Sequence, residues 1–280
     1  MEKLLLVDGS NLLFQMFFGM PARIVNADGK AIHGTLGFVG ALLKIVRMVE
    51  PTCIAVLFDG EHQNSRTELD AKYKANRPDY SEMPEEETPF SQLADIYRAL
   101  DYLGISHAET VDCEADDWIA GYVREYGATH RIVISSMDSD FFQLVTEKVS
   151  VLRYRGTGSI LCDEAYIREK LGIEAAQYAD FKSLVGDTAD NIPGVPRIGA
   201  KTAAQLLGAF GSLEGILEDL AHIKRSAVRA AIEANTERLR TNYRLIKLDG
   251  AQELPFSADR LRWIDGGQTT MRVLHGIGLK

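Results

Sequence analysis

The sequence predicts an α/β fold with a central, mostly parallel sheet flanked by helices, followed by a helical C-terminal region. In the first half of the chain, short continuous apolar runs alternate with stretches whose apolar residues recur at helical spacing. After about residue 163 the strand pattern ends and helical periodicity continues alone. Strands separated by helices are typical of a parallel sheet. We therefore expect an α/β domain over residues 1–162, a helical region over 163–250 and an unassigned extension over 251–280.

Four apolar runs in the first half predict strands. They lie at residues 3–7, 53–58, 105–109 and 131–135, and the third is the least apolar. Helical spacing predicts helices between them at 35–49, 89–103 and 114–126. Thr88 and Pro89 indicate the start of the second of these helices, because threonine caps a helix and proline suits its first position. Residues 77–89, with three prolines and four glutamates, predict an exposed excursion that has little to bury.

The second half is predicted to be helical throughout. The expected helices lie at 164–171, 175–185, 200–209, 213–220, 226–234 and 237–248. No low-complexity linker separates the two halves, so we expect them to pack together.

Composition excludes several classes of protein. With 46% hydrophobic and 25% charged residues over 280 positions, the chain has the make-up of a globular protein rather than a disordered or fibrous one. No apolar run approaches the ~20 residues that cross a bilayer, and the first residues lack the features of a secretory signal. Cys53, Cys113 and Cys162 are too few and too widely spaced for a disulfide framework or a zinc site. We therefore expect a reduced, cytoplasmic protein in which Cys113 is a buried thiol.

Charge is distributed unevenly along the chain. The net charge of -9 by itself argues against a nucleic-acid-binding protein. Residues 101–150, however, carry ten acidic and three basic side chains, whereas residues 191–247 carry nine basic and five acidic ones. This segregation favours a carboxylate-rich metal site beside a module that binds a polyanion, with ordinary surface scatter as the simpler alternative.

Acidic side chains follow three of the predicted strands. Asp8, Asp59 and Asp138 stand at strand ends, and Asp140 lies two residues further on. Ligands of open α/β sheets bind beyond the carboxyl ends of the strands, so we expect these carboxylates to converge there. Two further groups are Glu114, Asp116 and Asp117 at a predicted helix start, and Asp187 with Asp190. Each acid alone is also explained by a turn or a helix cap.

The joint pattern predicts a site for hard cations. Carboxylates without histidine or cysteine partners select Mg²⁺ or Mn²⁺ rather than zinc. The number of acids suits two ions ~3.5–4 Å apart, which together activate a water and stabilise the leaving oxygen in phosphoryl transfer.

Two basic segments are candidates for binding phosphates. The glycines of residues 191–203 do not match a Walker loop, because Ala200 stands before Lys201 and no strand leads in. A helix–hairpin–helix at about 186–209 fits better, with backbone N–H groups at the second helix holding a phosphate. In the other segment, Lys74 and Arg77 are spaced to reach one phosphate and Tyr73 offers a ring for stacking. The alternatives are an ordinary helical hairpin and a solvated helix face.

With these motifs in order, the sequence resembles the 5′-nuclease family of flap endonucleases and the 5′→3′ exonuclease domain of bacterial DNA polymerase I. The resemblance runs from about Lys3 to Gly250 and rests on the motifs LLLVDGSNLLF, FDG, YKANRP, EADD, SSMDSDFFQL and GDTADNIPGVPRIGAKTA. It implies a PIN-like or resolvase-like core, a helical arch at about 77–89 through which 5′ single strands pass, and a stand-alone form without a polymerase segment.

The resemblance also implies roles for individual residues. The acids implied to bind two Mg²⁺ or Mn²⁺ ions are Asp8, Asp59, Glu114, Asp116, Asp117, Asp138, Asp140, Asp187 and Asp190. Lys74 and Arg77 are implied to contact the reacting phosphate. The predicted DNA contacts are Arg66, Tyr73, Gly194, Val195, Arg197, Gly199, Lys201 and Thr202, with a K⁺ site implied at the hairpin. Gln15, Arg197 and the acidic arch depart from the family pattern.

The expected function is divalent-metal-dependent hydrolysis of DNA at 5′ ends, flaps or nicks, leaving a 5′-phosphate and a 3′-hydroxyl. We expect a monomer that acts in DNA replication or repair and does not bind a membrane. Two alternatives remain open at this point: a ribonuclease of the related PIN type, and a DNA-structure-binding protein whose catalysis has weakened.

Overall fold

The strands of the N-terminal half form one six-stranded sheet in the computed structural model, which describes residues 2–60, 65–80 and 83–279. Its order is β3-β2-β1-β4-β5-β6, and only β6 runs antiparallel to its neighbour. The strands are β1 Lys3–Asp8, β2 Cys53–Phe58, β3 Ser106–Glu109, β4 Arg131–Ser135, β5 Val149–Arg153 and β6 Ile160–Cys162. The predicted mostly parallel sheet is confirmed. Apolar patterning missed β5 and β6 because β5 contains polar residues and β6 is a short edge strand.

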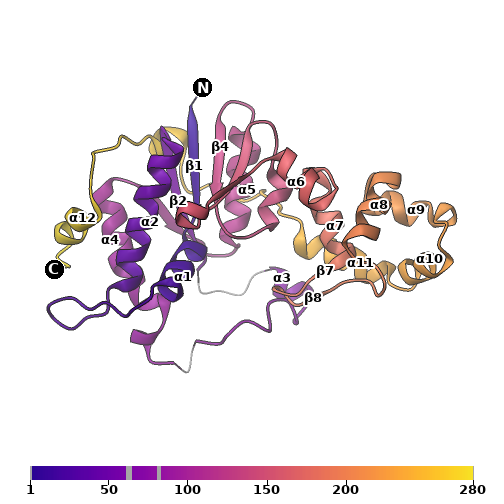
Figure 1. Cartoon of the computed structure of the whole chain (residues 1–280), viewed down its shortest axis with the longest axis horizontal. Helices are drawn as coiled ribbons and strands as arrows, with labels where there is room; N and C mark the ends of the chain where they lie inside the picture. The colour runs from indigo at the N-terminus through magenta and orange to yellow at the C-terminus, as the bar shows by residue number, and fades with distance from the viewer. Residues whose placement is uncertain (1, 61–64, 81–82, 280) are drawn as a thin grey trace.

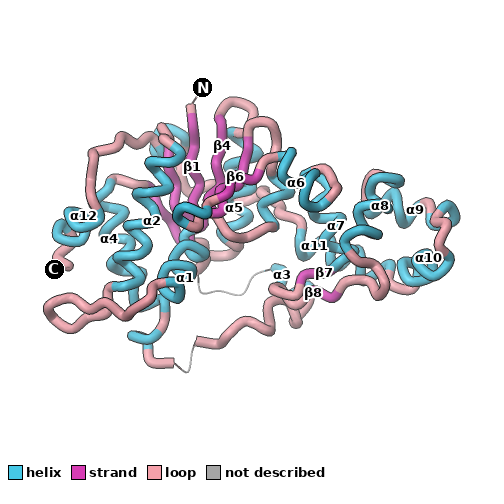
Figure 2. Tube along the Cα trace, in the orientation of Figure 1, coloured by secondary structure: helices cyan, strands magenta, loops and turns pink. Residues whose placement is uncertain are grey.

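Alternation along the central strand explains why both faces of the sheet are covered. Leu5 and Val7 of β1 pack against helices α1, α2 and α4 on one face, whereas Leu4 and Leu6 pack against α5 and the helical region on the other. The helices of the first half are α1 Gly9–Gly19, α2 His33–Val49, the short α3 Ser65–Leu69, α4 Leu93–Leu103 and α5 Ala115–Tyr126. Figures 1 and 2 show α1, α2, α4 and α5 around the strands, whereas the short α3 lies below the sheet.

The C-terminal half is helical as predicted and shares its apolar core with the sheet. Its helices are α6 Glu164–Leu171, α7 Tyr178–Val185, α8 Ala200–Phe210, α9 Leu213–Glu218, α10 Ser226–Glu233 and α11 Thr236–Ile246. Buried side chains from α8 to α11 belong to the same cluster as Leu4 and Leu6, so the two halves are continuous. Helices α8, α9 and α10 lie furthest from the sheet (Figure 1).

Residues 77–89 differ from the implied helical arch. Within its described residues, 77–80 and 83–89, this segment has no α-helix and no strand; it contains a 3₁₀ turn at Glu85–Glu87 and ends where a second one, Pro89–Gln92, begins. Three prolines and a run of glutamates disfavour an α-helix here, because proline removes backbone donors and like charges repel. The segment runs along the lower edge of the molecule from α3 back towards the core (Figure 1). Glu82, one of its four glutamates, lies outside the described residues.

The C-terminal extension returns to the N-terminal core. Trp263 donates its indole N–H to the carbonyl of Leu103 at 2.9 Å, and its backbone N–H pairs with Thr52. Helix α12, Thr270–Gly276, then packs its buried Val273 and Leu274 against α2 and α4. Among the described residues, none of the helices combines the length and apolarity that a bilayer crossing requires.

Candidate metal centre at the carboxyl end of the sheet

A cavity of about 450 Å³ opens where three central strands end. Four carboxylates line it: Asp8, Asp59, Asp116 and Asp138. Asp8 ends β1, Asp59 follows β2, Asp138 follows β4, and Asp116 lies in the first turn of α5. The predicted convergence of strand-end acids is therefore found for Asp8, Asp59 and Asp138, with Asp116 of the predicted helix start beside them, whereas Asp140 does not line the cavity. These strand-end acids come together because parallel neighbours place their carboxyl ends at one edge of the sheet.

Asp8 has two structural bonds besides lining the cavity. One oxygen accepts the N–H of Asn11 at 2.9 Å and so caps α1, while the other accepts the Ser136 hydroxyl at 2.8 Å. Ser136 also accepts the N–H of Asp138 at 3.0 Å, so one serine hydroxyl bridges Asp8 and Asp138. Asn11 accepts the N–H of Met137 at 3.0 Å. The helix-cap interpretation of Asp8 and the metal-site interpretation are thus both compatible with the structure.

Asp59 is bound to the neighbouring element on each side. Its N–H donates to the Ser10 hydroxyl at 2.8 Å, and its carboxylate accepts the N–H of Ala115 at 2.9 Å. The second bond ties the β2 end to the start of α5. Asp116, one residue further on, therefore faces the cavity from a fixed helix start.

Burial and neighbouring carboxylates raise the proton affinity of Asp8 and Asp116. Burial and the charge of Asp59 raise the pKa of Asp8 to about 7. Burial, followed by the charges of Asp138 and Asp8, raises the pKa of Asp116 well above its ordinary value. Within the described part of the chain, no three His, Cys, Asp or Glu side chains are gathered closely enough to hold one metal ion. Carboxylates without a cation between them repel, which is why these side chains hydrogen-bond to Ser, Asn and backbone groups instead.

A second acid group shares Asp138 with the cavity. Its other members are Asp140, Asp187 and Asp190. The negative charges of Asp187 and Asp190 contribute to raising the pKa of both Asp138 and Asp140. Asp187 is ion-paired with Lys182 of α7, and Asp190 with Arg77 at 2.8 Å. Asp140 is 8% exposed, and one of its carboxylate oxygens has no hydrogen-bond partner. A buried orphaned carboxylate oxygen is a vacant ligand for a hard cation.

Glu114 and Asp117 occupy a different position from the one expected. Arg66 donates one Nη to Glu114 at 2.8 Å and to Asp117 at 2.9 Å, and the other Nη to Asp117 at 2.7 Å. Its Nε donates to the carbonyl of Leu245 in α11 at 3.0 Å. Asp117 is thus held by a bidentate ion pair beside the cavity wall rather than in it. Its assignment as a metal ligand is corrected to that of a partner for Arg66.

The same network corrects two predicted DNA contacts. Arg66 is 7% exposed with its guanidinium bonded to three groups, so it cannot reach a DNA phosphate. Tyr73 is 6% exposed, and its hydroxyl donates to Glu114 at 3.3 Å, so its ring is not available to stack on a base. Sequence spacing placed both in a basic surface segment and could not show that this segment packs against α11.

Lys74 and Arg77 lie at the cavity as predicted. Lys74 donates its Nζ to Glu114 at 2.7 Å, and its N–H bonds the carbonyl of Asp190 at 3.0 Å. Its φ of 56° places it in the left-handed region, a strained conformation that the contacts with Glu114 and Asp190 hold. Arg77 remains half exposed, and both residues line the cavity beside the acids. Two cations at the rim of an acidic cavity are placed to receive a phosphate.

The hairpin between α7 and α8 is held by close backbone contact. The short strands β7 Gly186–Asp187 and β8 Ile192–Pro193 pair antiparallel. A Cβ at Gly194 would lie 2.2 Å from the carbonyl oxygen of Val185, so only glycine fits there. Gly199 is the N-cap of α8 and lies, with Lys201, on the surface. The first N–H groups of α8 therefore open towards solvent, as a phosphate site requires.

Within the hairpin, the predicted DNA contacts divide into two sets. Arg197 and Lys201 are exposed and Thr202 is partly exposed, so all three can reach a ligand. Val195 is 4% exposed, and its N–H donates to the carbonyl of Leu184 at 2.9 Å. Its assignment as a DNA contact is corrected, because its side chain is in the core and its donor is already used.

Some residues of the site were not foreseen. Phe14, Tyr80 and Phe90 form an aromatic wall of the cavity, with Tyr80 and Phe90 centroids 5.9 Å apart. They lie far apart in sequence, and no spacing signal joins them. Lys182 was also missed, since one lysine near a helix end is unremarkable in sequence. Gln15, which the resemblance marks as a departure from the family pattern, donates to the carbonyl of Tyr154 at 2.7 Å.

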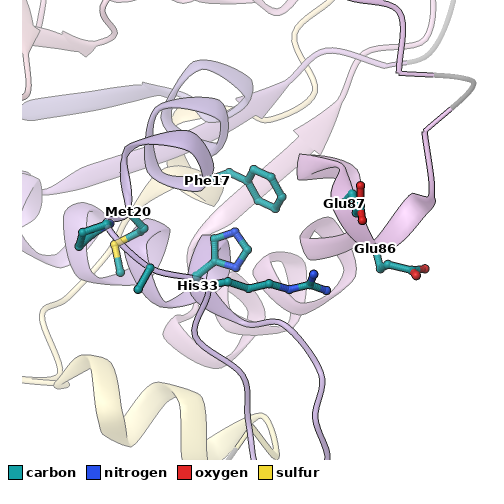
Figure 3. A pocket seen from close by; sticks show the side chains of 8 residues that line it. Phe17, Met20, His33, Glu86 and Glu87 are labelled. Atoms are coloured by element: carbon teal, nitrogen blue, oxygen red, sulfur yellow. The ribbon is translucent and has the colours of Figure 1, made fainter.

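A second hollow, of about 300 Å³, lies beside the end of α1. Figure 3 shows Phe17 and His33 against one another, with Glu86 and Glu87 facing them. Burial and the nearby Arg23 lower the pKa of His33. None of the strand-end acids lines this hollow. Cys113 is 5% exposed and burial raises its thiol pKa to about 12, consistent with the expected inert thiol.

Comparison with protein families shows to which family the chain belongs. Residues 3–172 match the 5′-3′ exonuclease N-terminal resolvase-like domain, and residues 173–267 match the 5′-3′ exonuclease C-terminal SAM fold. The chain belongs to the 5′-3′ exonuclease family. The match extends beyond Gly250, where the resemblance read from the motifs ends.

Individual relatives agree with this membership. A 5′-3′ exonuclease of Streptomyces coelicolor is 37% identical over 225 residues, which cover 76% of this chain and 73% of that protein. A thermostable DNA polymerase I of Thermus filiformis is 36% identical over 94% of this chain but only 31% of its own length. The chain thus spans about a third of the polymerases that it matches.

Solved structures share the fold. The 5′-exonuclease of bacteriophage T5 with bound zinc is 26% identical, with a TM-score of 0.73 over 88% of this chain and 89% of that one. The flap endonuclease of bacteriophage T5, in a complex with DNA and metal ions, has a TM-score of 0.71 and 25% identity over the same fractions.

Proposed function

We propose that this chain is a divalent-metal-dependent 5′ nuclease that hydrolyses DNA phosphodiesters at 5′ ends, flaps or nicks. The observation that carries the proposal is the cavity in which four strand-end and helix-start carboxylates face two cations, Lys74 and Arg77. Membership of the 5′-3′ exonuclease family supports the reaction class. The T5 structures solved with metal ions and with DNA support the cofactor and substrate classes.

The residues present fit hard cations. The cavity offers oxygen donors from Asp8, Asp59, Asp116 and Asp138, and Asp140 adds a buried oxygen without a partner. Mg²⁺ and Mn²⁺ prefer such ligands. We assign one ion to the cavity and a second to the group of Asp138, Asp140, Asp187 and Asp190. Divalent ions there lower the pKa of an attacking water and stabilise charge on the leaving oxygen.

The chain's own side chains account for binding and orientation. Lys74 and Arg77 neutralise the scissile phosphate and the charge that grows on it during attack. Glu114 holds the Lys74 ammonium at 2.7 Å, so the lysine is directed at the cavity before substrate arrives. Arg197, Lys201 and the start of α8 bind the duplex backbone without reading sequence, and we retain K⁺ at the hairpin as part of the proposal.

The proposed biological setting is DNA replication or repair in the cytoplasm, with the chain acting as a monomer. The helical region with its hairpin favours duplex DNA over the RNA of PIN-type ribonucleases. The acids that line the cavity favour an active enzyme over a weakened structure-binding protein.

The test is cleavage of an end-labelled 5′-flap DNA and a matched RNA flap with Mg²⁺, with Mn²⁺ and with EDTA. We expect metal-dependent cuts near the DNA flap junction. Asp138→Asn should abolish them, because Asp138 lies in both acid groups, and should leave DNA binding largely intact. The matched control is Asp259→Asn, an exposed carboxylate remote from the cavity, which should cut like the unmodified protein. Cleavage by Asp138→Asn at the unmodified rate would overturn the site, and preferred cleavage of RNA would favour the ribonuclease.

A further inference from the structure

Lys182 places a positive charge inside the second acid group. It lies in the last turn of α7, and its ammonium is paired with a carboxylate oxygen of Asp187. The side chains of Lys182 and Asp187 are only 14% and 13% exposed. The other oxygen of Asp187 accepts the N–H of Ala189 at 2.9 Å. Both oxygens of Asp187 therefore already have partners.

The same acid group contains Asp140, and one of its buried carboxylate oxygens has no hydrogen-bond partner.

The charges of the group show why this lysine differs from Arg77. Among the four carboxylates of Asp138, Asp140, Asp187 and Asp190, Asp187 is ion-paired with Lys182 and Asp190 with Arg77. Arg77 is 52% exposed and can turn towards a phosphate while leaving Asp190. Lys182 is enclosed, so its charge remains in the group whether or not DNA is bound.

We propose that Lys182 is a built-in cation of the second acid group, which competes with a divalent ion for Asp187 and so sets the metal affinity of that group. The inference rests on the proposed function, and it adds a determinant of metal affinity outside the carboxylates. A divalent ion has to displace the ammonium or tolerate its repulsion. The second group therefore binds more weakly than the cavity acids, and two classes of metal site differ in affinity.

The test is Mn²⁺ binding to the full chain without DNA. Binding is measured by electron paramagnetic resonance of the free Mn²⁺ and, independently, by calorimetry. Lys182→Met keeps the length of the side chain and removes its charge. Its weaker class of site should bind about tenfold tighter, which corresponds to ~1.4 kcal/mol, because the divalent ion no longer competes with the ammonium for Asp187. Lys182→Gln should shift in the same direction. The tighter class should change little.

Two controls isolate the position of the charge. Lys182→Arg keeps a cation at Asp187 and should keep the unmodified affinity. Lys170→Met removes a lysine that is 56% exposed, and it should also leave Mn²⁺ binding unchanged. Thermal unfolding in EDTA checks that each variant is folded. Lys182→Met leaves Asp187 without its cation. The melting temperature of this variant should therefore fall in EDTA and recover when Mn²⁺ is added.

The outcomes separate this inference from the proposed function. Unmodified protein that binds no Mn²⁺ overturns both. Unmodified protein that binds Mn²⁺, with Lys182→Met and Lys182→Gln showing the same affinities, overturns the role of Lys182 alone. Tighter binding in these two variants but not in Lys170→Met supports it.

Discussion

At the scale of single residues, Asp8 combines structural and chemical roles. It ends β1, caps α1 through the N–H of Asn11 and accepts the Ser136 hydroxyl, while its carboxyl lines the acidic cavity. These bonds favour the charged form, yet burial and Asp59 outweigh them and raise the pKa to about 7. The carboxyl therefore binds a proton more tightly in the folded chain than in the unfolded one, where its pKa is 3.8.

We predict that metal-free protein becomes less stable as pH rises. A raised carboxyl pKa contributes stability that is complete below about pH 4 and is lost as pH rises through about 7. Asp116, Asp138 and Asp140 are shifted in the same direction. His33, with a lowered pKa, opposes them but is one group against four. In EDTA, the melting temperature should fall by at least about 2 °C between pH ~5.5 and pH ~8.

Two controls test this prediction: addition of a divalent metal, and the variant Asp8→Asn. Mg²⁺ or Mn²⁺ should remove the loss at high pH, because the cation replaces the protons between the carboxylates. Asp8→Asn has no proton to lose and should show a flatter dependence on pH. A melting temperature in EDTA that stays level or rises over this range would contradict the prediction.

At the scale of an element, the hairpin between α7 and α8 depends on unusual backbone conformations. Gly186, with a φ of 83°, and Gly194 bring their backbones together where no Cβ fits. Arg197 has a φ of 71°, in the left-handed region that favours glycine. A non-glycine residue costs roughly 1–2 kcal/mol there, and the proposed phosphate contact is a role for which the charge of an exposed arginine would offset that cost.

We predict that Arg197→Gly separates stability from DNA binding. Relief of the left-handed strain offsets the extra chain entropy of glycine, so the melting temperature should stay level or rise slightly. Duplex affinity should fall across all sequences, and the dependence on salt should weaken by about one phosphate contact. Fluorescence anisotropy over a salt series measures both. Arg197→Lys keeps charge and strain and is the control; an unchanged salt slope in Arg197→Gly would argue against a phosphate contact.

At the scale of the whole molecule, the segment around residues 66–77 joins the core to the helical region. Arg66 bonds α5 through Glu114 and Asp117 and bonds α11 through the Leu245 carbonyl. Tyr73 packs with Leu245 and with Ile192 of the hairpin region. The acid cavity, the cations at its rim and the hairpin are therefore positioned by one connected set of contacts.

We predict that Arg66→Met strongly destabilises this connection. It leaves Asp117 buried without its cation and leaves Glu114 with Lys74 alone, and removing one partner of a buried ion pair costs about 3–5 kcal/mol. Arg238→Met is the matched control, because Arg238 also links α11 to this segment, through Asp70, but is 41% exposed. Its loss should cost less than about 1 kcal/mol. Denaturant unfolding in EDTA measures both, and equal effects would show that burial of Arg66 is unimportant.

Much of the fold follows from local pattern. Strands at 53–58 and 131–135 and the helix at 164–171 form as predicted, because each has apolar residues that only one periodicity can bury. Strand β6 was not foreseen, and the segment after Arg77 is the exposed excursion that its composition predicts rather than the helical arch that the resemblance implies. The first is a short edge strand whose pairing comes from β5, and the second lacks apolar residues that would specify any regular structure.

The sequence by itself determined the α/β class and the acids at the strand ends, because strand periodicity and the position of a residue after its strand are local properties. Only the tertiary structure decided which acids share the cavity. Packing of α3 against α11 buried Arg66 and drew Asp117 towards it, and the last turn of α7 placed Lys182 on Asp187. These pairings join residues whose separation in sequence carries no periodic signal, so charge neutralisation on burial, rather than pattern, selected each partner.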